Sequence, residues 1–247
     1  MSGKSEVNDD VFRVEDGEAP LKLSNERQVF REQGGADFTV TAVGAVAKRT
    51  GEKMTLHFAS VKDDRPGAVC VAVIKAAEGP DFEDRYLVAR HWRASVGQWE
   101  WEFPRGMGEP GETIEETSVR ELHEETGISS DVGQIRFLQI IHADAGVLRD
   151  NIAVTAVEFS SDEERREALA KVPAESGDVE KVPEESGDGG RSPSYARRTE
   201  TDCRPGIDWE LSHMRWVAES DLKRYIAQGG IVDGITLSSF FLYLLRR

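Results

Sequence analysis

The sequence predicts an α/β fold with a small amino-terminal antiparallel β region. Three observations carry this prediction. Residues 68–74, AVCVAVI, form a continuous apolar run, which is typical of a strand buried on both faces. Residues 114–125 have the start and stop signals of a helix. Residues 38–58 alternate apolar and polar side chains around a turn near Gly51, which indicates an antiparallel hairpin.

Composition limits the classes of function that we expect. The chain has 247 residues and a formal net charge of −15, so a ligand that follows a nucleic-acid backbone is not expected. The sequence starts without an apolar signal region and has no stretch long enough to span a membrane. We therefore expect a cytoplasmic protein with neither nucleic acid nor a membrane as its partner. Cys70 and Cys203 lie in an apolar run and a polar loop, so we expect no disulfide or zinc site.

The composition of successive segments predicts that the chain has three structural parts. Residues 1–36 are mostly polar and are expected to form a flexible amino-terminal segment, residues 37–66 hold the β region, and residues 67–247 form the main domain. Within that domain the segment KVPAESGD recurs ten residues later as KVPEESGD. A polar repeat rich in Pro, Gly, Ser and Glu cannot bury enough apolar surface to order itself. We therefore predict a disordered insertion at about residues 171–205.

Local patterns predict the remaining elements. Strands are expected at residues 85–93, 134–143, 151–159 and 211–217, and helices at 161–170, 221–228 and 236–245. Ser220 is the expected N-cap of the helix at 221–228. In the last helix Leu237, Phe240, Phe241 and Leu244 recur at helical spacing, so we expect them to pack on the core.

The helix at residues 114–125 carries three carboxylates beside its apolar face. Its capping residues are Thr113, Glu116 and Gly127. Glu121, Glu124 and Glu125 fall within about a 100° arc of the helix. Like charges at this spacing repel one another, and burial increases the repulsion. A hard divalent cation, Mg²⁺ or Mn²⁺, would remove the conflict by taking carboxylate oxygens as ligands.

These carboxylates belong to a longer pattern. Residues 106–128, GMGEPGETIEETSVRELHEETGI, fit the spacing G-x5-E-x7-R-E-U-x-E-E-x-G-U, in which U is a bulky aliphatic residue, at every fixed position. A solvated Glu-rich helix is the alternative, but a match at this many fixed positions arises by chance at most about once in ten thousand such chains. The matching residues are Gly106, Glu112, Arg120, Glu121, Leu122, Glu124, Glu125, Gly127 and Ile128.

The pattern resembles the Nudix box, the signature of the Nudix hydrolase family. The segments RHWR (90–93) and EFPRG (102–106), together with the carboxy-terminal segment, resemble the ADP-ribose pyrophosphatase-like members. The resemblance implies a Nudix α/β/α sandwich with a mixed sheet. It also implies that the amino-terminal sheet serves dimerisation, so that a homodimer is expected.

The resemblance implies a divalent-metal-dependent hydrolase. Glu121, Glu124 and Glu125 would ligate Mg²⁺ or Mn²⁺, with the backbone carbonyl of Arg105 as a further ligand. Glu121, Glu124 and Arg120 would be catalytic residues.

The roles of the box arginine and of the catalytic base have alternatives. Arg120 is expected to orient the carboxylates through Glu112, and a surface ion pair with Glu116 is its alternative. In ADP-ribose-type members the base lies on a late loop, and in others it lies within the box. The candidates are Asp208 and Glu210 on the loop, with Glu210 as the assigned catalytic residue, and Glu124 in the box.

Substrate contacts are expected from the strand before the box. The resemblance implies that Arg90, Arg93 and Arg105 bind phosphates and that Trp92 or Trp99 stacks on a base, with packing in the sheet as the alternative for each tryptophan. The implied substrate is a nucleoside diphosphate linked to another moiety, ADP-ribose or a nucleotide sugar, which is cut to a nucleoside monophosphate and a phosphorylated moiety. A nucleoside triphosphate pyrophosphohydrolase and a Nudix-fold sensor that binds without cutting are the alternatives.

Overall fold

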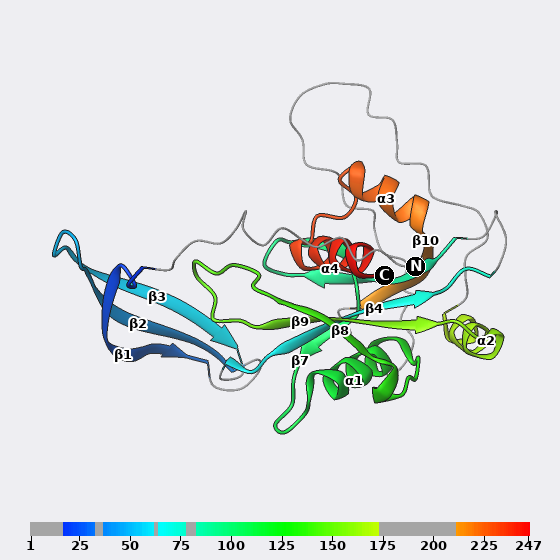
Figure 1. Cartoon of the computed structure of the whole chain (residues 1–247), viewed down its shortest axis with the longest axis horizontal. Coiled ribbons are helices and arrows are strands. Elements are labelled where there is room, and N and C mark those ends of the chain that lie inside the picture. The colour runs from blue at the N-terminus through cyan, green and yellow to red at the C-terminus, as the bar shows by residue number, and fades with distance from the viewer. Residues whose placement is uncertain (1–16, 33–36, 62–63, 78–82, 173–210) are drawn as a thin grey trace. The chain divides into compact units, whose positions relative to one another are not determined.

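The computed structural model describes residues 17–32, 37–61, 64–77, 83–172 and 211–247 (Figure 1). The chain divides into two compact units, Met1–Ser60 and Val61–Arg247. In chain order the elements are β1 (Leu21–Arg31), β2 (Phe38–Ala47), β3 (Lys53–Val61), β4 (Gly67–Ile74), β5 (Arg85–Arg93), β6 (Gln98–Glu102), β7 (Arg105–Met107), α1 (Ile114–Thr126), η3 (Val132–Gln134), β8 (Arg136–Ile141), β9 (Ile152–Phe159), α2 (Asp162–Lys171), β10 (Leu211–Ala218), α3 (Glu219–Ala227) and α4 (Gly234–Arg246).

The first unit is a sheet in the order β1-β2-β3. β2 and β3 form the predicted hairpin, with Gly51 in the left-handed conformation (φ 73°) at its turn. The prediction of a flexible segment through residue 36 is wrong for Leu21–Arg31, because this segment forms β1 and pairs antiparallel with β2. The side chains of β1 stay almost entirely exposed, so main-chain hydrogen bonding to β2 holds a strand whose polar sequence does not reveal it.

The second unit contains a mixed sheet. Its strands follow the order β10-β5-β4-β9-β8, with β6 paired to β5 and β7 paired to β4. β4 runs parallel to β9 and antiparallel to β5 and β7. The strands expected at residues 85–93 and 68–74 are confirmed almost residue for residue, and every residue of β4 is buried.

Alternate residues of β4 face two different cores. Val69, Val71 and Val73 pack in a cluster with residues of α3 and α4, including Leu222 and Phe240. The intervening residues of β4 pack instead in a second cluster, with residues of α1 and α2. Figure 1 shows α1 on one side of the sheet and α3 and α4 on the other. The unit is therefore an α/β/α sandwich, as expected.

The sheet forks along β4, and the fork positions the site. One end of β4 pairs with β5 through Val73 and Ile74, whereas the other end pairs with β7. Between these pairings the N–H of Cys70 donates to the carbonyl of Pro104 at 2.9 Å. Phe103, beside Pro104, is fully buried. The chain between β6 and β7 thus crosses the fork and carries Glu102 and its neighbours toward α1.

Two details of the carboxy-terminal helices differ from the prediction. Ser220 does not cap α3, because β10 runs directly into the helix and Ala218 occupies the cap position without a side-chain bond. The Ser220 hydroxyl and N–H donate instead to the Glu83 carboxylate, each at 2.8 Å. In α4, Phe241 is 61% exposed, while Phe240 and Tyr243 are buried. Leu237, Phe240 and Leu244 pack on the core as expected, whereas Phe241 does not.

The remaining predictions concern the insertion, the late loop, membrane-spanning helices and dimerisation. The insertion expected at about residues 171–205 begins at the end of α2, where Val172 is buried. Its remainder, residues 173–205, lies outside the described residues, as do Cys203, Asp208 and Glu210. None of the described helices is long and apolar enough to span a membrane. The use of the first unit for dimerisation stays a prediction.

Candidate active site

The helix α1 forms as its capping signals predict. Thr113 accepts a hydrogen bond from the Glu116 N–H, the Glu116 side chain accepts one from the Thr113 N–H, and Gly127 ends the helix with φ 73°. Ser118 and Leu122 are fully buried, and the Ser118 hydroxyl lies 2.9 Å from the Thr155 hydroxyl of β9. The helix is therefore fixed at both ends and along its inner face, so that its carboxylates project from a rigid support.

Gly106 leaves room for one of these carboxylates. A Cβ atom at this position would lie 2.2 Å from the carboxyl carbon of Glu121, and no real Cβ atom comes so close. The main chain at Gly106 therefore packs directly against the Glu121 carboxylate, and any side chain there would displace it.

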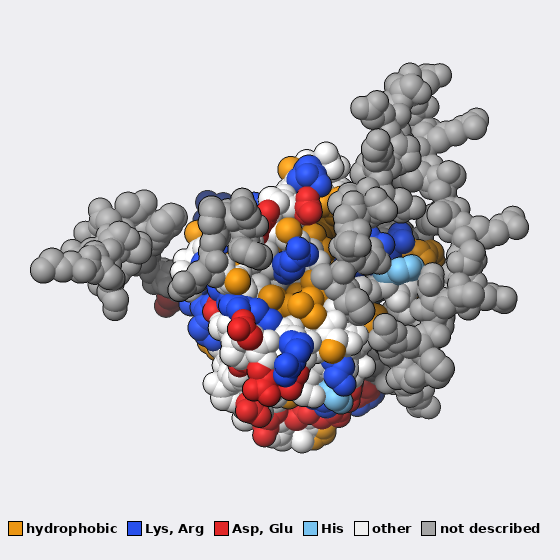
Figure 2. Space-filling model, turned by 90° about the vertical axis from the view of Figure 1, so that its right-hand side faces the viewer, with side chains coloured by type: hydrophobic (Ala, Val, Ile, Leu, Met, Phe, Trp, Pro, Cys, Tyr) orange, Lys and Arg blue, Asp and Glu red, His pale blue; other side chains and the backbone are white. Residues whose placement is uncertain are grey.

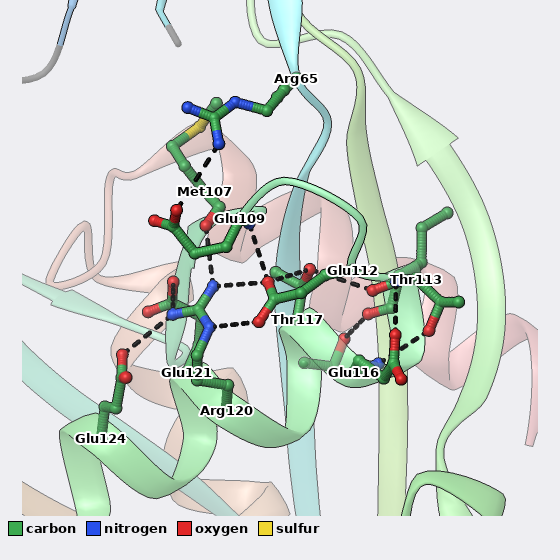
Figure 3. A network of polar contacts seen from close by, with 12 residues as sticks. Arg65, Met107, Glu109, Glu112, Thr113, Glu116, Thr117, Arg120, Glu121 and Glu124 are labelled. Carbon is green, nitrogen blue, oxygen red and sulfur yellow. Dashed lines mark hydrogen bonds and ion pairs between the residues drawn. The ribbon is translucent and has the colours of Figure 1, made fainter.

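Arg120 gathers the carboxylates around one guanidinium group (Figure 3). Its Nε and Nη2 donate to the two oxygens of Glu112 at 2.7 and 3.0 Å. Its Nη1 donates to Glu121 at 2.8 Å and to Glu124 at 2.9 Å, and Nη2 also reaches the carbonyl of Met107 at 2.9 Å. The geometry is that of the predicted orienting role through Glu112, whereas Glu116, the alternative partner, forms the capping box.

The electrostatics of this pair keep both members charged. The hydrogen bonds from Arg120 lower the pKa of Glu112 to about 2, against the opposing effect of burial. Hydrogen bonds to Glu112 and then Glu121 raise the pKa of Arg120 above its already high ordinary value. Arg120 therefore remains a fixed cation among the carboxylates throughout the physiological range.

Glu125 has a different environment. Its side chain is 12% exposed, and its Oε2 has no hydrogen-bond partner among the described residues. Burial, followed by the charge of Glu121, raises its pKa well above the ordinary value. The main-chain amide of Arg105 and the charges of Arg105 and Arg93 oppose this shift only in part. His91 Nε2 lies 3.8 Å from Glu125 Oε2, at the buried end of β5.

A buried carboxylate that sequence reasoning missed links two of the predicted arginines. Glu102, at the end of β6, is fully buried and accepts hydrogen bonds from Arg93 Nε and Nη2 at 2.7 and 2.6 Å. It also accepts one from Arg105 Nε at 2.7 Å. Burial opposes ionisation of Glu102, but the two arginines outweigh it and lower its pKa. The alternation of WEWEF places Glu102 with Glu100 on one face of β6, which was the signal available in the sequence.

Comparison with known proteins identifies the family. The model of the NUDIX domain matches residues 64–186, which include β4 to α2 and the whole pattern at residues 106–128. The chain belongs to the Nudix family.

The relatives of this Nudix chain match it over limited lengths. "Putative nudix hydrolase 1" of Caenorhabditis elegans is 32% identical over 149 residues, which are 56% of this chain and 38% of that protein. "Nucleoside diphosphate-linked moiety X motif 6" of Mus musculus is 44% identical over 46 residues, 19% of this chain and 15% of that protein. The chain thus spans less than half the length of these curated relatives. A crystal structure of an "ADP compounds hydrolase" matches 58% of this chain and 69% of that chain, with a TM-score of 0.44 and 19% identity.

The residues of the Nudix box fit a divalent cation in donor chemistry. The buried Oε2 of Glu125 lacks a hydrogen-bond partner among the described residues, and the Glu121 carboxylate lies in the space that Gly106 leaves. Both are hard oxygen donors of the kind that Mg²⁺ and Mn²⁺ prefer. Within the described part of the chain, no group of three such side chains is already arranged around one point. Glu124, whose side chain is 57% exposed and turned to Arg120, is the donor that would have to rotate.

Other predicted residues of this Nudix chain are not brought to the box. Arg90 and Arg93 are three positions apart in β5, so they face opposite sides of the sheet. The Arg90 guanidinium lies 5.9 Å from the ring centres of Trp99 and of Trp101, which packs on the α3 and α4 core. Trp92 contacts Trp99 edge to face at 5.6 Å. Arg93 and Arg105 are therefore the predicted phosphate ligands beside the box, whereas the cluster of Arg90, Trp92 and Trp99 is on the other face.

Proposed function

We propose that this Nudix chain hydrolyses, with Mg²⁺ or Mn²⁺, the diphosphate linkage of a nucleoside diphosphate joined to another moiety. ADP-ribose and nucleotide sugars are the substrates that we expect. The products would be a nucleoside monophosphate and a phosphorylated moiety, such as a sugar phosphate.

One observation carries the proposal, namely the state of the carboxylates of the box. Arg120 holds Glu112, Glu121 and Glu124 together, while Glu125 keeps a buried oxygen without a hydrogen-bond partner among the described residues. A bound divalent cation would neutralise charge on the diphosphate and make a water molecule more acidic. The chain's own part is to orient these oxygens through Arg120, and to keep Glu125 out of bulk water.

The substrate class has its own support. A diphosphate carries negative charge on the oxygens of both phosphate groups, and Arg93 and Arg105 are cations whose charges act on Glu125. The mouse relative is named for a nucleoside diphosphate-linked moiety. The Glu124 side chain, exposed and bonded to Arg120, is the described candidate for the base, because Glu210 lies outside the described residues.

A substrate panel tests the proposal. ADP-ribose, several nucleotide sugars and the nucleoside triphosphates would be incubated with the full chain and Mg²⁺ or Mn²⁺, and the products identified by mass spectrometry. We expect cleavage between the two phosphates of a diphosphate-linked compound, and none in EDTA. Cleavage of triphosphates alone would contradict the substrate class, and no metal-dependent cleavage of any compound would contradict the activity.

A further inference from the structure

The buried carboxylate of Glu102 is shared by two arginines that come from different strands. Arg93 is the last residue of β5 and Arg105 the first of β7, and both donate to Glu102 at 2.6 to 2.7 Å. The Glu102 side chain is 0% exposed, while those of Arg93 and Arg105 are 27% and 24% exposed. The carboxylate is therefore inside the protein, and the two guanidinium groups extend from it toward the surface.

Stability alone does not account for this arrangement. Replacing a buried ion pair by apolar side chains is often neutral or stabilising, because removing the charges from water costs more than their attraction returns. The bidentate pair with Arg93 already satisfies both oxygens of Glu102. Arg105 is an additional cation, and in the described part of the chain its Nη2 also lies 3.8 Å from Asp233 Oδ1.

Both arginines keep unused donors. The hydrogen bonds of the described residues use Nε and Nη2 of Arg93 and only Nε of Arg105. Arg93 Nη1 and the two terminal nitrogens of Arg105 thus have no hydrogen-bond partner in the described part of the chain. A planar guanidinium group matches the oxygens of a phosphate, and holding it in place reduces the entropy lost on binding.

The position of the arginines relates them to the Nudix box. The charges of Arg93 and Arg105 both act on Glu125, and the main-chain amide of Arg105 contacts that carboxylate. Arg105 also directly precedes Gly106, against which the Glu121 carboxylate packs. The two guanidinium groups are therefore close enough to Glu125 for their charges to act on it.

We propose that Glu102 is a positioning residue that holds Arg93 and Arg105 as a two-arginine clamp, and that this clamp binds one phosphate of the diphosphate. The inference rests on the proposed function, since it places the diphosphate beside the box. It assigns to Arg105 a contact through its side chain that needs no metal ion. The clamp therefore binds a diphosphate in the absence of divalent cations.

Binding of ADP to the full chain in EDTA, measured by calorimetry, tests the clamp. We expect the wild type to bind ADP, and Glu102→Gln and Arg105→Ala each to weaken the Kd by about tenfold, as for the loss of charge-assisted hydrogen bonds. In turnover with Mg²⁺, both variants should raise KM more than they lower kcat. The double variant should be little worse than either single one, because Glu102 acts through the arginines.

Glu219→Gln is the matched control. Glu219 is also shared by two cations, Lys223 and Arg247, and also accepts a hydrogen bond from Tyr86, but it belongs to α3. Its loss should lower the melting temperature without changing the Kd for ADP. If Glu102→Gln fails to fold, Arg105→Ala and Arg105→Lys give the same test, with lysine expected to restore part of the affinity.

The outcomes separate this inference from the proposed function. An unchanged Kd and KM in Glu102→Gln and Arg105→Ala would overturn the clamp, even where the wild type hydrolyses its substrate. Failure of the wild type to bind ADP in EDTA would also overturn it. If ADP binds through the clamp but no compound of the panel is cleaved, the proposed activity fails while the clamp stands as a binding site.

Discussion

The carboxylates carried by α1 have two different electrostatic environments, one around Arg120 and one at Glu125. Arg120 donates hydrogen bonds to Glu112, Glu121 and Glu124, and those to Glu112 lower the pKa of that carboxyl group. Glu125 faces the interior, where burial and the charge of Glu121 disfavour its ionisation. The fold therefore disfavours the ionised form of Glu125, and a bound cation would stabilise that form.

We predict that Glu125→Gln raises the melting temperature in EDTA at neutral pH. The folded-state pKa of Glu125 lies above its ordinary value of 4.5, so its ionisation costs stability. This cost is absent below pH 4.5 and grows as the pH rises toward the folded-state pKa. The difference in melting temperature between variant and wild type should therefore widen from pH 4.5 upward.

The same variant should lose the response to Mg²⁺. Millimolar Mg²⁺ is expected to raise the melting temperature of the wild type by linkage but to leave Glu125→Gln nearly unchanged. Glu167→Gln, at an exposed position of α2, should respond as the wild type does. A wild type that is insensitive to both Mg²⁺ and the substitution would show that the site does not bind the cation.

We predict that Gly106→Ala impairs turnover far more than folding. The new methyl group would displace the end of the flexible Glu121 side chain, which lies 2.2 Å from the Cβ position. A misplaced catalytic group of this kind costs about 100-fold in kcat, while the melting temperature should fall by only a few degrees. Gly133→Ala, where a Cβ meets nothing within 4 Å, is the control. Equal turnover in the two variants would refute the role given to Gly106.

At the scale of the element, the sequence predicts the ends of α1 more completely than it predicts the buried face of α4. The caps of α1 are side chains at fixed offsets, so Thr113, Glu116 and Gly127 could be identified without tertiary information. In α4 apolar residues occupy much of the helix circumference. Whether Phe240 or Phe241 is buried therefore depends on which side chains of the sheet the helix contacts. On the sheet, the ring of Tyr86 packs edge to face against Phe240 and Tyr243, with ring centres 5.1 and 5.6 Å apart. These contacts place Phe240, and not Phe241, on the buried face.

We predict that truncation separates the two phenylalanines of α4. Phe240→Ala should cost about 3–5 kcal/mol of stability, because it empties a buried site in the core. Phe241 is 61% exposed, so Phe241→Ala should change stability by no more than about 0.5 kcal/mol. Chemical denaturation at constant pH measures both. A larger loss in Phe241→Ala would mean that its exposed face is covered in solution.

The candidate site was predictable to the extent that it lies in one continuous motif. Residues 106–128 include the box carboxylates and Arg120, and their spacing alone predicts their shared face. The partnership of Glu102 with Arg93 and Arg105 could not be predicted in this way, because it depends on the fork at β4 that brings β5 and β7 around one carboxylate. Arg90 and Arg93 are three positions apart on a strand, so the sequence alone was enough to predict that their side chains lie on opposite faces of the sheet.

At the scale of the whole molecule, the polar repeat is the part of the chain with the least capacity to stabilise a core. Its composition favours charged and small residues over apolar ones. Deletion should start after Val172, because that residue is buried where α2 ends.

We predict that removal of residues 173–192, joined by a short Gly-Ser linker, leaves the melting temperature nearly unchanged. A parallel deletion that also removes Val172 and the last turn of α2 should lower it, since Ala168 and Val172 both belong to the core on this side of the sheet. The two proteins would be compared by thermal denaturation under identical conditions. A large loss of stability in the first deletion would show that the repeat contributes to the fold.

The turnover number of Glu125→Gln, relative to the wild type, on the best substrate of the panel tests most directly whether the box glutamates perform metal-dependent diphosphate hydrolysis. Loss of an electrostatic stabiliser of the transition state predicts a fall in kcat of at least about 100-fold, with the melting temperature retained or raised. Glu124→Gln should behave similarly in kcat. Near-normal, Mg²⁺-dependent turnover in both variants would contradict the account.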